Sequence, residues 1–252
     1  MTTPNLAQFR NAITSSGLPT PSDAFLQSIL QARPLAALAA TARHRLLSSN
    51  LASTSTSASP AILSPQAGRF PAGLTDVTVK ACRLADDVCV QVLDVEDIGH
   101  SRWEQVDALE KERRGETVKG REVIRVVPDL DDAATQTQTQ TQAQTHAPEH
   151  GSTQQQGPFK LLVQDAGGLK IYALELRRVE KISMPRVRAT GTGMSIGCKL
   201  MLRRGTKVAR GVVLLEPKDV VVLGGKIEVL DKAWREGREK RLRDEVGDTS
   251  AR

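Results

Sequence analysis

The side chains best suited to chemistry are few and poorly spaced for it. Cys82, Cys89 and Cys198 are an odd number with no C-x-x-C pair, which argues against a disulfide framework and for a reducing compartment. His146 and His150 have H-x3-H spacing, but no cysteine pair precedes them and they lie in a polar tract. We therefore expect no metal site and no cofactor.

Residues for acid–base or nucleophilic catalysis are also missing. Asp94, Glu96 and Asp97 follow one another on an expected strand, where only Asp94 and Glu96 would share a face. The chain has no G-x-S-x-G element, no Cys/His nucleophile signature and no Walker A motif. The glycines of residues 191–197 resemble a dinucleotide loop, but their spacing is wrong and no βαβ unit surrounds them. The sequence predicts a binding protein, not an enzyme, with no small-molecule substrate.

Nucleic-acid binding requires cations for the phosphates and, for single strands, aromatic rings on which bases stack. Residues 170–210 contain eleven basic and two acidic side chains, in a chain of net charge +6. Rings are scarce, and for Tyr172 a core or cross-strand role is more common than a stacking platform. We expect weak electrostatic DNA contact at most, while a single-stranded nucleic-acid-binding protein stays open as the alternative. The cations that could contact phosphates are Arg203, Arg204 and Lys207.

Two periods of hydrophobicity divide the chain. Helical spacing over residues 1–50 predicts a unit of three short helices, and a Ser/Thr/Ala/Pro-rich linker follows over residues 51–72. A period of two then predicts a half-buried strand over residues 88–93, and no βαβ alternation follows, so we expect a small closed barrel of five main strands. A charged helix is expected from about residue 227 to 246. The further expected strands are residues 123–127, 159–164, 169–176, 199–203, 207–216 and 220–223.

A long insertion, residues 98–157, separates the first two barrel strands. It begins with a helical piece over residues 101–114, in which Trp103, Val106 and Leu109 share a face. An alternating Thr/Gln tract follows, and residues 133–157 are expected to be disordered because they cannot bury enough apolar area. Such a short helix is marginal alone. Either the barrel covers its apolar face, or the helix orders the base of the loop and presents its basic residues to a partner.

Two local patterns give sharper expectations. Val213 and Leu215 should face one side of their strand and Val212 and Leu214 the other, so that one apolar face fills the barrel and the other meets helices or a partner. At least one glycine of the pair at 224–225 should have positive φ or lie where no Cβ fits.

Several motifs point to a known family. Residues 211–217 read G-V-V-L-L-E-P, residues 221–228 read V-V-L-G-G-K-I-E, and residues 197–199 read G-C-K. The strand exit at residues 94–98 is followed by a helix that ends in R-R-G at residues 113–115. Together with the leading helices, these resemble the RecQ-mediated genome instability proteins over most of residues 5–240. The Thr/Gln tract and the lack of a second OB domain depart from that family.

The resemblance implies a mainly β fold with helices: an N-terminal three-helix unit, an OB-fold barrel over residues 73–230 and a charged C-terminal helix or tail over residues 231–252. It implies a nuclear, non-catalytic accessory subunit that binds a type IA topoisomerase III and a RecQ-family helicase. Its expected effect is to stimulate decatenation and double Holliday junction dissolution during DNA replication, repair and homologous recombination. No membrane association is expected. The protein-binding residues so implied are Trp103, Val106, Leu109, Arg113, Arg114, Lys119, Lys199, Gly224 and Gly225.

Overall fold

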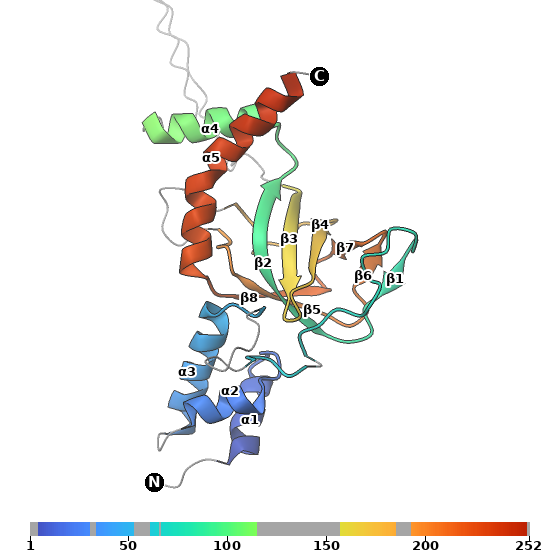
Figure 1. Cartoon of the computed structure of the whole chain (residues 1–252). Helices are drawn as coiled ribbons and strands as arrows, with labels where there is room; N and C mark the ends of the chain where they lie inside the picture. Colours follow the sequence, from blue (N-terminus) through green and yellow to red (C-terminus); the bar gives the residue numbers. More distant parts are fainter. Residues whose placement is uncertain are drawn as a thin grey trace, which may run out of the picture.

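The computed structural model describes residues 5–30, 34–52, 61–65, 67–114, 157–184 and 193–250. Within these residues, three helices come first, eight strands form one sheet, and two more helices lie beside that sheet (Figure 1). The helices are α1 (Leu6–Ser15), α2 (Asp23–Ile29), α3 (Leu35–Ser48), α4 (Arg102–Arg114) and α5 (Glu228–Ser250). The strands are β1 (Cys82–Arg83), β2 (Val88–Asp97), β3 (Phe159–Asp165), β4 (Lys170–Glu175), β5 (Lys199–Leu202), β6 (Lys207–Ala209), β7 (Val212–Leu215) and β8 (Val220–Gly224).

The sheet confirms the expected OB-fold but is a curled half-barrel. Its strand order is β1-β6-β7-β4-β3-β2-β5-β8, in which β2 pairs with both β3 and β5, and β4 runs parallel to β7. The ends of this order, β1 and β8, are not paired with each other, so the described strands do not form the closed five-stranded ring that we expected. The leading helices confirm the predicted helical unit.

The single strand expected over residues 207–216 was wrong. Arg210 and Gly211 both have positive φ, 49° and 75°, and this left-handed pair turns the chain into a hairpin between β6 and β7. A Cβ at Gly211 would lie 2.8 Å from the carbonyl oxygen of Thr75, so the close approach of another backbone also favours glycine there. The strand expected over residues 123–127 lies outside the described residues.

The faces of β7 follow the predicted alternation. Val213 and Leu215 are fully buried in the main core, whereas Val212 and Leu214 are half-buried on the other side. This confirms the assignment of one apolar face to the interior of the barrel. The outer face stays partly accessible.

Strand β2 is not half-buried as predicted, because its first half is buried on both faces. Cys89 packs, with Met201 of β5 opposite it, into a second core built mainly by the leading helices. Gln91 is equally buried; its side chain accepts from the Leu51 backbone N–H at 2.9 Å and donates to Asn50 at 2.5 Å. The helical unit therefore docks on the outer face of β2 and β5, beneath the sheet in Figure 1.

The segment expected to be a linker contributes to both cores. Leu51, Ile62 and Leu63 are buried with the leading helices, and Phe70 is buried with the barrel. A bridge between Pro21 and Leu63 ties part of this segment to the helical unit. The few apolar residues of this segment are therefore packed into the cores, although the surrounding Ser, Thr and Pro give it the composition of a linker.

Gly224 and Gly225 confirm the expectation for their backbone. Both have positive φ, 87° and 94°. A Cβ on Gly224 would enter open space, whereas one on Gly225 would lie 2.4 Å from the carbonyl oxygen of Leu47 at the end of α3. The second glycine is therefore where the helical unit and the last strand touch.

We expect Gly225→Ala to lower the free energy of unfolding more than Gly224→Ala does. Gly224→Ala should cost about 1–2 kcal/mol, because only the left-handed backbone penalises it. Gly225→Ala adds a backbone clash that can be relieved only by shifting α3. Urea melts of the two variants check this, and equal losses would contradict the close approach.

Candidate functional site

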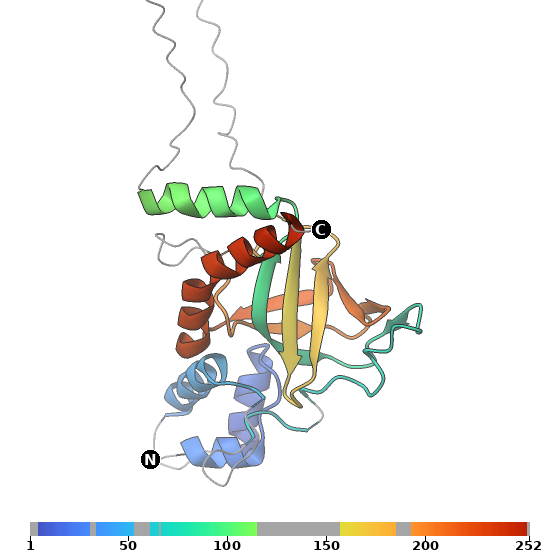
Figure 2. The same cartoon turned by 45° about the horizontal axis from the view of Figure 1, so that its top comes forward.

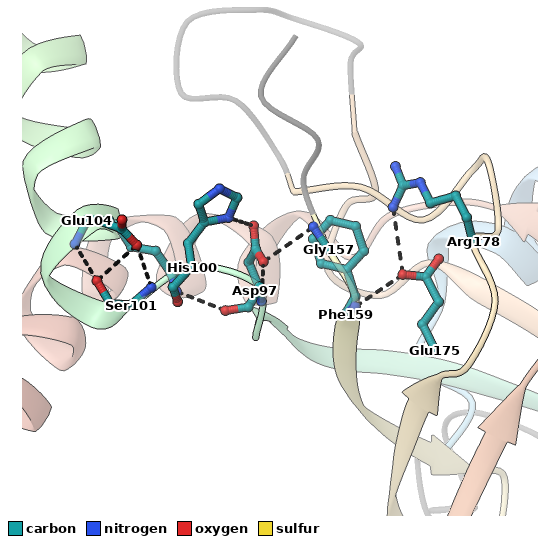
Figure 3. A network of polar contacts seen from close by, with 10 residues as sticks. Asp97, His100, Ser101, Glu104, Gly157, Phe159, Glu175 and Arg178 are labelled. Carbon is teal, nitrogen blue, oxygen red and sulfur yellow. Dashed lines mark hydrogen bonds and ion pairs between the residues drawn. The ribbon is translucent and has the colours of Figure 1, made fainter. Parts of the chain in front are cut away.

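The base of the insertion is a polar network centred on one carboxylate (Figure 3). Asp97, at the end of β2, is almost fully buried. Its Oδ1 accepts from the backbone N–H of Gly99 at 2.9 Å and from that of Gly157 at 3.3 Å, while Oδ2 lies 2.9 Å from Nδ1 of His100. Asp97 thus joins the two ends of the insertion, because it contacts Gly157, which lies 60 positions further along the sequence.

Helix α4 begins directly after this network. The Ser101 hydroxyl accepts from the Glu104 backbone N–H at 3.2 Å, and the Glu104 carboxylate accepts from the Ser101 N–H at 2.8 Å, which is a reciprocal capping box. Hydrogen bonds that the Ser101 N–H and the Ser101 hydroxyl donate to this carboxylate lower the pKa of Glu104. One turn on, the buried Gln105 amide donates to the carbonyls of Asp97 and His100. The helix is therefore fixed in direction where it leaves the sheet.

A second buried carboxylate secures the start of β3. Glu175, at the end of β4, accepts from the backbone N–H of Phe159 at 3.1 Å and from that of Val179 at 2.7 Å. The Arg178 guanidinium lies 3.7 Å from the same carboxylate and over the Phe159 ring. Polar contacts thus hold the end of β2 and the start of β3, the two points from which the insertion leaves and re-enters the sheet (Figure 3).

Helix α5 packs beside α4, as both views show (Figures 1 and 2). Ion pairs join the two helices, including Arg102 with Glu245 at 2.6 Å and Arg243 with Glu110 at 2.6 Å. Trp234 is buried against the barrel and donates its indole N–H to Asp94. Helix α5 therefore braces α4 against the barrel.

The apolar face expected on α4 is only partly buried. Val106 is buried and Leu109 half-buried, but Trp103 is 67% exposed, so the alternative in which the barrel covers this face does not hold for the tryptophan. On a helix, Trp103 and Leu109 lie on opposite sides of Val106, and the packed side includes Gln105 and Leu109. Arg113 and Arg114 are exposed on the last turn, where Arg113 pairs with Glu239 and Arg114 with Glu110. Lys119 lies outside the described residues.

Lys199 was predicted to bind a partner, and the structure overturns this. The side chain has no exposed surface, and its ammonium donates to the Gly197 carbonyl at 2.7 Å. Burial lowers the pKa of Lys199 to about 8 and raises that of the Cys89 and Cys198 thiols to about 12 and 11. The docked helical unit covers this part of β5, so Lys199 acts inside the fold.

The three predicted phosphate contacts lie together at the turn between β5 and β6. Arg204 and Lys207 are exposed, whereas Arg203 forms an ion pair with Asp87 at 2.7 Å. Burial opposes the charge on Asp87, but hydrogen bonds from Arg204 N–H and the Arg203 side chain outweigh it and keep the Asp87 pKa below its usual value. A phosphate at Arg203 would have to compete with this carboxylate.

The described part of the chain contains no group of three or more His, Cys, Asp or Glu that could hold a metal ion. None of its described helices is long and apolar enough to cross a membrane. Sequence reasoning missed His100, Gln105 and Glu175, and it treated Asp97 only as part of an acidic run. The S-x-x-E pattern of Ser101 and Glu104 was a usable signal, whereas the contacts of Asp97 with Gly157 and of Glu175 with Phe159 join residues distant in sequence.

The class of protein follows from two units, a leading helical unit and an OB-fold half-barrel with an insertion between β2 and β3. Together they define an OB-fold protein with an N-terminal helical domain. A family model described as "RMI1, N-terminal OB-fold domain" matches residues 70–238, and one described as "RMI1, N-terminal helical domain" matches residues 13–54. The chain belongs to this RecQ-mediated genome instability family and has a role in genome maintenance.

One curated relative is the RecQ-mediated genome instability protein 1 of Schizosaccharomyces pombe. It is 28% identical to this chain over 152 residues, which are 60% of this chain and 61% of the relative. The matched region therefore spans about six tenths of the curated relative.

Proposed function

We propose that this protein is a non-catalytic, nuclear accessory subunit that binds a type IA topoisomerase III and a RecQ-family helicase. It would stimulate decatenation and double Holliday junction dissolution. The observation that carries this proposal is the match to two RMI1 family models, in the order helical domain and then OB-fold domain. Support also comes from the insertion, which leaves the barrel at the place that the family resemblance implies.

The base of the insertion is suited to act as a lever, by which we mean a segment of fixed starting direction that contacts a moving part of the partner. A segment inserted at a partner's gate can shift an open–closed equilibrium only if it makes unequal contacts in the two states. Such contacts require a defined starting direction. Asp97 and the capped start of α4 supply that direction, and α5 braces the helix from the side. Exposed Trp103, Arg113 and Arg114 are the partner contacts that we propose on the described part of this lever.

Decatenation assays with purified topoisomerase III test this function. Replacing residues 98–157 with a short Gly/Ser linker should leave the barrel folded and abolish stimulation. Asp97→Ala, which leaves two backbone N–H groups without their acceptor, should reduce stimulation while the insertion is still present. Deletion of residues 135–144 is the matched control and should have little effect, because loop closure depends only weakly on length. Equal stimulation by the full replacement would contradict the lever.

Weak DNA contact is a second proposal, favoured by the exposed cations of the β5–β6 turn. Charge reversal of Arg203, Arg204 and Lys207 should weaken sequence-independent binding and flatten its dependence on salt. Tight, salt-resistant binding to single strands would instead favour a direct nucleic-acid-binding function.

A further inference from the structure

Helix α5 has two halves with different contacts. Its first half is anchored in the barrel, because Asp231 accepts from the backbone N–H of Ile196 at 2.9 Å and the indole of Trp234 donates to Asp94. The Trp234 ring also belongs to the core of the barrel. The second half leaves the barrel and crosses α4 (Figures 1 and 2). One half of the helix is therefore fixed to the barrel, and the other can hold the helix that it crosses.

The contacts between α4 and the second half of α5 combine apolar and charged side chains. Val106 of α4 and Leu242 of α5 are buried, although neither belongs to the core of the barrel or to that of the helical unit. Since α5 is the described element against which α4 mainly packs, these two side chains are buried where the helices meet. Beside them, Arg243 pairs with Glu110 of α4 at 2.6 Å and with Glu239 of its own helix at 2.8 Å. Beyond its first turn, α4 is therefore held by α5.

The residues that hold α4 follow the region that matches the family. The model of the OB-fold domain matches residues 70–238, and Glu239, Leu242 and Arg243 come directly after it. The contacts that anchor the first half of α5, at Asp231 and Trp234, lie inside the match. The part of α5 that holds α4 is thus separate from the matched OB-fold domain, and its role needs an explanation of its own.

We propose that the second half of α5, residues 239–246, positions the insertion helix for stimulation of the topoisomerase and does not contribute to the affinity for it. The inference rests on the proposed function, in which a segment of fixed direction acts on the partner. Asp97 and the capped start of α4 fix only the root of that segment, and a working geometry requires support beyond the root. Leu242 and Arg243 supply it, so we assign them as positioning residues.

Charge reversal at Arg243 tests this role. In Arg243→Glu the new carboxylate lies beside those of Glu110 and Glu239, so the two helices repel each other at this point. Decatenation assays should show about two- to fivefold less stimulation at unchanged topoisomerase affinity. Adding Glu110→Arg places an opposite charge on α4 again, and the double variant should recover most of the stimulation. Leu242→Ala, which removes the apolar contact, should lower stimulation in the same way as Arg243→Glu.

Lys240→Glu is the matched control, because it makes the same change of charge in the same half of the helix. Lys240 is exposed and lies opposite Leu242 around the helix, away from α4. This variant should keep both the affinity and the stimulation of the unaltered chain. Isothermal titration calorimetry measures the affinities, and thermal melts establish that each variant folds. If Arg243→Glu does not fold, Arg243→Ala, which adds no charge, replaces it in every comparison.

The direction of α4 can also be measured without a partner. Ala108→Cys on α4 and Lys170→Cys on β4 place spin labels at two exposed positions, in a background with Cys82→Ser so that the half-buried cysteine is not labelled. Double electron–electron resonance should give a narrow distribution of distances in this labelled chain. Arg243→Glu should broaden the distribution, and the addition of Glu110→Arg should narrow it again.

The outcomes separate this inference from the proposed function. An unchanged distance distribution in Arg243→Glu would overturn the inference. A broadened distribution with full stimulation would also overturn it and would leave the proposed accessory subunit intact. Equal losses of affinity and stimulation would make residues 239–246 a docking surface, which contradicts a positioning role. If the unaltered chain does not bind topoisomerase III, the proposed function fails and the dependence of stimulation on α5 fails with it.

Discussion

Leu215→Ala is expected to lower the free energy of unfolding by about 2–5 kcal/mol. Leu215 is fully buried in the main core, on the face of β7 that fills the barrel. Truncation removes its transfer free energy and leaves a cavity that the paired strands on either side cannot close. The loss would be a large fraction of the stability of a domain of this size.

Leu214→Ala is the matched control, because the two leucines are adjacent and of identical chemistry. Leu214 is half-buried on the outer face, so its truncation should cost no more than about 2 kcal/mol. Chemical denaturation followed by circular dichroism measures both variants. Melts unchanged for both, or a larger loss for Leu214, would show that the two faces have been assigned wrongly.

The pH dependence of stability should carry the signature of the buried Lys199. Its folded pKa is about 8, against 10.5 in an exposed lysine. Between these values the unfolded chain binds the proton and the folded chain does not, so the free energy of unfolding rises with pH. The whole shift corresponds to roughly 3 kcal/mol.

The two buried thiols act in the opposite direction at higher pH. Cys89 and Cys198 have folded pKa values of about 12 and 11, against 9.0 when exposed. Above pH 9 the unfolded chain therefore loses thiol protons that the folded chain keeps, and stability falls. These groups together should give a maximum of stability near pH 9.

Urea melts between pH 7 and 11 separate these contributions when the unaltered chain is compared with a lysine variant and a double cysteine variant. Lys199→Met should lose the rise between pH 8 and 9. Cys89→Ala/Cys198→Ala should extend the rise toward pH 10.5. A Lys199→Met variant with the same pH profile as the unaltered chain would refute the buried ammonium.

Much of this protein was determined by local sequence. The alternation along residues 212–215 assigned the inner and outer faces of β7, because successive side chains of a strand must point to opposite sides. The glycines at 224–225 were expected where the backbone takes positive φ, and both do. Capping and helical spacing placed the leading helices. Periodicity alone narrowed the fold class to a small barrel. The family motifs then indicated the OB-fold.

Tertiary contacts decided what covers each surface. Lys199 and Cys89 alternate with core residues of their strands, and nothing in those strands shows that the leading helices cover their face. Lys199, which was predicted to contact a partner, is therefore buried inside the fold. Whether the barrel covers the apolar face of the helix at residues 101–114 was left open; in the structure Val106 is buried and Trp103 stays exposed. Asp97 contacts Gly157, 60 positions away in sequence, and no local pattern encodes that contact. The physical reason is common to all three: burial and hydrogen bonding depend on which elements meet, whereas periodicity reports only the element itself.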